Sequence, residues 1–159
     1  SQIKRKYLGH LIDANFGSGT ATNYRLGKDL EEYNIELNPE VETKKNILGE
    51  QSAKLKSYEP SSSIDTYYGD YDEALTTALL AKANERATGD DVKTTVVDFL
   101  INEEGKLEWA YQEDAVIAVK SLGGANEGVN IPFDIHYTGN RKRVNLDLTT
   151  YAVSEYTAG

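Results

Sequence analysis

Hydrophobic and polar residues alternate along most of this 159-residue chain, as in β-strands with one buried face. The alternation is clear over 106–111 and 129–137, and residues 92–101 are rich in β-branched residues, which also favour a strand. A continuously apolar stretch at 115–119 predicts a strand that is buried on both faces. We therefore predict a mainly β fold, a β-sandwich or a partly closed barrel of antiparallel strands, with one flanking α-helix.

The helix is predicted at about 70–88, where apolar residues recur every three to four positions. Asp70 is predicted as the N-cap, with Glu73 three residues further on, as in a capping box. Gly89 is predicted to end the helix. The residues predicted to pack this helix on the sheet are Leu75, Leu79, Leu80 and Ala83.

The clearest hairpin is predicted at about 30–48, with its turn at Asn38-Pro39-Glu40. Its alternation gives two faces. The face predicted to pack on the domain core carries Tyr33, Ile35, Leu37, Val41 and Ile47. The opposite, polar face carries Glu32, Asn34, Glu36, Glu42, Lys44 and Asn46. Over residues 29–50, seven acids stand against two bases, which predicts a hairpin with an acidic polar face.

The remaining breaks in the pattern are local turn signals. Pro60 interrupts a strand over 53–68, and Gly139-Asn140 is predicted as a II′ hairpin turn. The last residues, about 150–159, are predicted as an extended arm. No linker-like segment divides the chain, so residues 1–159 are predicted to form one domain.

Composition narrows the class of function. The formal charge of −9 disfavours a DNA-groove or phosphate-binding domain, which is usually basic. The absence of Cys excludes disulfides, thiolate nucleophiles and Cys-ligated metals. No apolar run reaches membrane-spanning length, and the start of the chain is not interpreted as a signal peptide.

Candidate chemistry is sparse. His10 and His136, the two histidines, each fall on the polar phase of a strand and are predicted to be solvated or at an interface. No phosphate-binding loop, dinucleotide fingerprint or nucleophile elbow occurs. The basic run 141–143 is predicted at a hairpin tip, solvated or against an acidic patch of a neighbour. We expect no enzyme and no catalytic, cofactor or metal site.

Four segments in order along the chain carry a family resemblance: 4–13, 25–39, 42–50 and 131–140. On these residues the sequence resembles the bacteriophage major tail (tail tube) proteins of the siphophage type. The similarity spans nearly the whole chain, and the ordered set, rather than any catalytic signature, carries it.

The resemblance implies two packed antiparallel sheets with a flanking helix, and rings of six subunits stacked into a tube. In that family a long hairpin from each subunit joins a barrel around the lumen, and 30–48 is the matching segment. Its polar face would line the lumen, where acidic side chains repel DNA phosphate.

The partners that the resemblance implies are other copies of the chain, tail terminator and tail-tip proteins, and transiently the tape-measure protein and double-stranded DNA in the lumen. It implies no cofactor and no membrane partner. The expected location is the virion, after synthesis in the bacterial host cytoplasm.

Three other interpretations stay open. The inner tube of a contractile tail or tailocin shares the implied fold. A carbohydrate-binding β-sandwich would be monomeric and would present a flat aromatic platform, for which Trp109 and Tyr111 are the candidates. A glycosidase, with Glu108 beside that platform, is the weakest interpretation.

Overall fold

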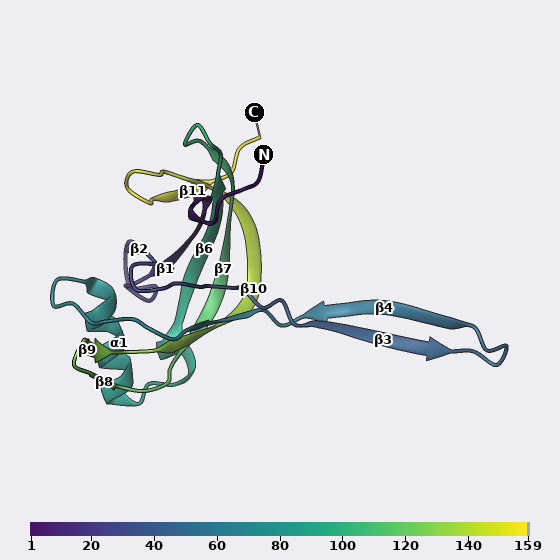
Figure 1. Cartoon of the computed structure of the whole chain (residues 1–159), viewed down its shortest axis with the longest axis horizontal. Helices are drawn as coiled ribbons and strands as arrows, with labels where there is room; N and C mark the ends of the chain where they lie inside the picture. The colour runs from purple at the N-terminus through teal and green to yellow at the C-terminus, as the bar shows by residue number, and fades with distance from the viewer. Residues whose placement is uncertain (159) are drawn as a thin grey trace.

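The computed structural model describes residues 1–158, and one curled antiparallel sheet with one helix forms the body of the domain (Figure 1). The sheet order is β11-β10-β7-β6-β1-β2, and β5 pairs with the first residues of β10, on the edge whose other end pairs with β11. Its strands are β1 (Leu8–Asp13), β2 (Asn23–Arg25), β5 (Ser61–Ile64), β6 (Lys93–Ile101), β7 (Leu107–Val119), β10 (Phe133–Leu146) and β11 (Val153–Glu155). The sheet curls into a half-barrel, which confirms the prediction of a mainly β fold with one flanking helix.

Smaller elements complete the chain. Two strand pairs lie outside the main sheet, β3 with β4 and β8 with β9. The bounds are β3 (Pro39–Lys45), β4 (Gln51–Tyr58), β8 (Gly123–Ala125), β9 (Gly128–Asn130), α1 (Ala74–Glu85) and the 3₁₀ turns η1 (Arg5–Tyr7) and η2 (Gly89–Val92). Within residues 1–158, no helix combines the length and the apolar character needed to cross a membrane.

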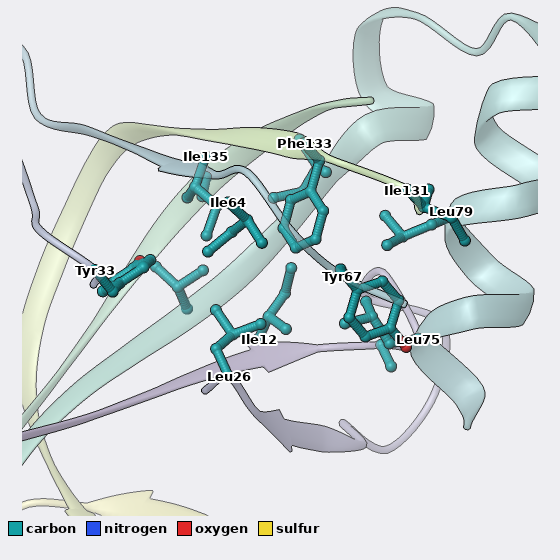
Figure 2. Packing of buried hydrophobic residues seen from close by; sticks show 14 of the residues in the cluster. Ile12, Leu26, Tyr33, Ile64, Tyr67, Leu75, Leu79, Ile131, Phe133 and Ile135 are labelled. Carbon is teal, nitrogen blue, oxygen red and sulfur yellow. The ribbon is translucent and has the colours of Figure 1, made fainter. Parts of the chain in front are cut away.

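Both faces of the sheet are covered, so adjacent residues on the central strands enter two different cores. Ile12 and Val96 face the cluster under α1, whereas Leu11 and Val97 face the cluster under the C-terminal segment. Figure 2 shows the first cluster, in which Leu75 and Leu79 of α1 lie beside Tyr67 and Ile131. This double burial explains why these strands are apolar at consecutive positions.

The helix begins and ends inside its predicted range. Its N-cap position is Glu73, which makes no side-chain cap, and Asp70 instead accepts a hydrogen bond from the backbone N–H of Asp72. The predicted capping box is therefore wrong. Arg86 ends the helix in the left-handed conformation, so Gly89 lies beyond it at the start of η2.

The predicted turn at Asn38-Pro39-Glu40 is also wrong. Asn38 adopts a positive φ of 47°, but the chain then continues into β3 instead of returning. The actual hairpin pairs Pro39–Lys45 with Gln51–Tyr58, and its turn covers residues 46–50. The long hairpin is thus displaced towards the C-terminus from 30–48 to 39–58.

The predicted hairpin turn at Gly139-Asn140 is a bulge within one long strand. β10 runs from Phe133 to Leu146, and its register against β7 shifts on both sides of Gly139. Arg141, Lys142 and Arg143 therefore lie along a strand and not at a hairpin tip.

Candidate assembly surface

The β3–β4 hairpin projects from the half-barrel as a free ribbon (Figure 1). Every residue of its two strands is exposed except Glu42, which is half-buried. An isolated two-stranded hairpin is at best marginally stable in water. A ribbon of this length without a supporting layer is therefore typical of an element that acquires its support from another chain.

One face of this ribbon is mainly apolar over the part next to the domain and carries Lys45 opposite Gln51 towards the tip. The register places Val41 opposite Leu55, Thr43 opposite Ala53 and Pro39 opposite Tyr58. Directly opposed residues share a face, so these side chains form a continuous strip. Val41, Leu55 and Tyr58 are 57%, 48% and 52% exposed. We call this set of six residues the apolar strip.

The other face is polar and close to neutral. Glu42 lies 3.9 Å from Lys44 and 3.8 Å from Lys56, measured from carboxylate oxygen to Nζ. Within 39–58, three acids stand against four bases, so the ribbon carries one net positive charge in a chain of net charge −9. The acidic face predicted for the hairpin does not form, because the acids before residue 39 lie outside the ribbon.

The residues predicted to form the hairpin's core face separate in the structure. Tyr33 is buried, and Ile35 packs against the same cluster, but both lie in the irregular segment before the ribbon. Leu37, Val41 and Ile47 are 53%, 57% and 102% exposed, so their predicted packing on this chain's own core is wrong. For Val41 and Ile47 the reason is that no layer of the domain lies behind the ribbon, whereas Leu37 lies before the ribbon and lines a hollow beside Tyr137.

The polar residues predicted to line a lumen also divide into two groups. Glu32 accepts a hydrogen bond from the side chain of Asn34, and Glu36 pairs through its backbone with Ser61 at the domain. Glu42 and Lys44 share the polar face of the ribbon. The expectation that these residues share one hairpin face is wrong.

Asn46 closes the ribbon's turn. Its side-chain oxygen accepts hydrogen bonds from the backbone N–H groups of Leu48 and Glu50, at 2.9 and 3.0 Å. The turn consequently presents Ile47 and Leu48 outward, at 102% and 78% exposure. Asn46 is therefore a turn-forming residue.

The four helix residues face the domain in different degrees. Leu75 and Leu79 are fully buried, Leu80 packs against the core cluster, and Ala83 is half-buried. Their stripe places α1 against one face of the half-barrel, on the opposite side of the domain from the ribbon (Figure 1).

A buried polar cluster surrounds His10, which corrects its prediction as a solvated or interface residue. His10 and Asp98 are directly paired on β1 and β6, with 2.7 Å between Nδ1 and the carboxylate. The Arg5 guanidinium lies 2.9 Å from Nε2. Because a guanidinium can only donate, this geometry assigns the neutral imidazole with its proton on Nδ1. The second histidine, His136, is exposed.

Two tyrosines complete this cluster. The Tyr137 hydroxyl donates to Asp98 at 3.2 Å, and burial, followed by the Asp98 charge, raises the pKa of Tyr137. Burial raises the pKa of Tyr33 to about 12, and its backbone carbonyl accepts a hydrogen bond from Arg5. The cluster thereby ties the N-terminal segment and the segment before the ribbon to the sheet.

The aromatic pair considered for carbohydrate binding does not form a flat platform. The rings of Trp109 and Tyr111 are tilted by 56°, and the Arg141 guanidinium covers Tyr111 at 4.6 Å. Arg141 also pairs with Glu113 at 3.1 Å. The basic run therefore begins in contacts with its own sheet, which removes the predicted sugar-stacking surface.

Taken together, the chain is a β half-barrel with one helix and one unsupported ribbon. No known family model and no curated protein matches the sequence. Its fold is similar to that of a cap of the anti-feeding prophage, described as the tube terminating cap and solved by electron cryomicroscopy. The TM-score is 0.50 at 8% identity, covering 90% of this chain and 91% of that one. At this identity the likeness establishes a shared fold.

Proposed function

We propose that this chain is a structural subunit of a phage tail tube that assembles with copies of itself. The observation that carries the proposal is the apolar strip on a ribbon without support from its own domain. The likeness to a protein that terminates a tube supports it, as does the sequence resemblance to tail tube proteins. In this proposal the chain is not an enzyme.

Assembly works by covering the strip. A neighbouring subunit removes Val41, Leu55 and Tyr58 from water, and the polar face with Glu42 and Lys44 stays hydrated. The family resemblance supplies the number of subunits, six per ring, and the stacking of rings around a channel. DNA and the tape-measure protein pass through that channel without sequence-specific contacts, and terminator and tail-tip proteins close its ends in the virion.

A tube-terminating cap is the second candidate, because the similar structure is itself such a cap and matches over nearly its whole length. A cap would form one ring and stop, whereas a tube subunit would stack. The inner tube of a contractile tail is a variant of the first proposal, and a neighbouring sheath gene would identify it.

Negative-stain microscopy of the purified protein, with sedimentation velocity on the same sample, tests these proposals. Stacked rings or tubes support the tube subunit, and single rings that do not stack support the cap. Monodisperse monomers at all concentrations, without any partner present, would contradict self-assembly and favour a monomeric binding domain.

A further inference from the structure

The tip of the ribbon is an apolar knob with a basic flank. Ile47 and Leu48 project into solvent at the end of the hairpin, held by the turn around Asn46. Lys44 and Lys45 lie just before Asn46 at the end of β3, and both are exposed. Two adjacent aliphatic side chains at the far end of a projecting element are the kind of exposed apolar patch that marks a contact site.

A hollow of about 490 Å³ lies at the end of the sheet where β6 turns into β7. Its apolar lining includes Ile3, Leu100, Ile101 and Trp109, which are exposed or half-buried. Its acidic lining residues are Glu103, Glu104 and Glu108, all exposed. Its volume lies within the range of sites that enclose small ligands.

We propose that the tip of one copy, at Ile47 and Leu48, inserts into this hollow of a second copy. The two surfaces match in chemistry: aliphatic side chains meet an apolar lining, and two lysines meet three carboxylates. A chain cannot fill its own hollow, because its ribbon points away from the domain (Figure 1). The inference rests on the proposed function and specifies which surfaces of two subunits meet.

The contact joins two different surfaces, so a growing assembly keeps one free tip and one free hollow at its two ends after every addition. Contacts of this head-to-tail kind close into rings or continue as stacks, depending on the rotation between neighbours. The docking therefore accounts for growth beyond a dimer, which a contact between two identical surfaces would not.

The Cys-free sequence gives a direct test. We would mix the single variants Leu48→Cys and Glu104→Cys and treat the assembled sample with a short bismaleimide cross-linker. The matched control replaces Glu104→Cys with Tyr71→Cys, a fully exposed position just before α1. We expect a cross-linked dimer at least tenfold more abundant with Glu104→Cys than with Tyr71→Cys, as measured by denaturing gel electrophoresis.

The outcomes separate the two proposals. Rings or tubes with no excess cross-link at Glu104→Cys would overturn the docking and leave self-assembly standing. Absence of any assembly would overturn both. Adding Lys45→Glu to the Leu48→Cys variant should lower the cross-link several-fold, because it replaces attraction to the acidic rim by repulsion. An unchanged yield would contradict the charge match, and circular dichroism would verify that each variant is folded.

Discussion

Substitution of Leu55 by Asp should abolish assembly and leave the folded monomer intact. Leu55 lies in the middle of the apolar strip, opposite Val41, on a ribbon that is separate from the main sheet. A carboxylate there faces water in the monomer but would face a neighbouring subunit in the assembly. The variant therefore separates stability from association.

The magnitude follows from the exposure of this side chain. Leu55 is 48% exposed, so about half of the gain from full burial, about 1 kcal/mol, is still available at a subunit contact. Placing a carboxylate in that contact costs several kcal/mol in lost hydration. The change should weaken each contact by about 4 kcal/mol, or about a thousandfold in its association constant.

Sedimentation velocity would measure association, and thermal unfolding of the dilute protein would measure stability. The matched control is Ser52→Asp, three residues away on the same strand but on the polar face opposite Lys44. We expect Leu55→Asp to sediment as a monomer with an unfolding midpoint close to that of the wild type, and Ser52→Asp to assemble normally. Assembly by Leu55→Asp, or equal loss in both variants, would refute the assignment of the two faces.

Three predictions concern the domain and are measured by denaturant unfolding. Gly9→Ala should lower the free energy of unfolding by about 1–3 kcal/mol, because the new Cβ would overlap the ring of Phe99 on the paired strand. An unchanged unfolding midpoint would contradict this packing. Asp98→Ala should lower the free energy of unfolding by about 2–5 kcal/mol, because it leaves the Nδ1–H of His10 without its acceptor. A loss below about 1 kcal/mol would show that water replaces the carboxylate. The raised pKa of Tyr33, about 12, favours the neutral phenol in the folded chain, so stability that is complete below pH 10 should fall as the pH rises towards 12. Tyr33→Phe should lessen that alkaline loss, and an identical pH profile would contradict the coupling.

The local sequence pattern was sufficient to predict the strand β6 and the helix α1. The prediction of a strand at 92–101 agrees with β6 at Lys93–Ile101, and a short turn connects β6 to β7. The helical period at 70–88 contains α1. The signal for β6 is its run of β-branched and apolar residues, and the signal for α1 is the helical spacing of its buried Leu75 and Leu79.

Turn signals were insufficient because they do not say whether the chain reverses. Asn38-Pro39 and Gly139-Asn140 both bend the backbone, and Asn38 and Asn140 both adopt positive φ. One bend leads into the ribbon, and the other is a bulge in β10. Whether a bend becomes a hairpin turn or a bulge depends on which strand pairs with it, and the residues around the bend do not specify that strand.

The prediction that His10 is solvated or at an interface was wrong for a related reason. Its acceptor Asp98 lies 88 residues away and becomes its neighbour only through the register of β1 against β6. Each residue alone fits the polar phase of a surface strand. A polar residue in each of two otherwise apolar strands was the available signal, and it becomes specific only once the two strands are paired.

The distribution of charge favours contact between the ribbon and a neighbouring domain over contact between two ribbons. The ribbon carries one net positive charge, so the rest of the chain carries the entire negative excess. Two ribbons packed strip to strip would bring like charges together, whereas a ribbon laid on a neighbouring domain brings opposite charges together. That contact is necessarily between unlike surfaces, and contacts between unlike surfaces propagate into rings and stacks. In the proposed assembly, the positive ribbon would link subunits whose domains otherwise repel one another, and this linkage should weaken as salt is added.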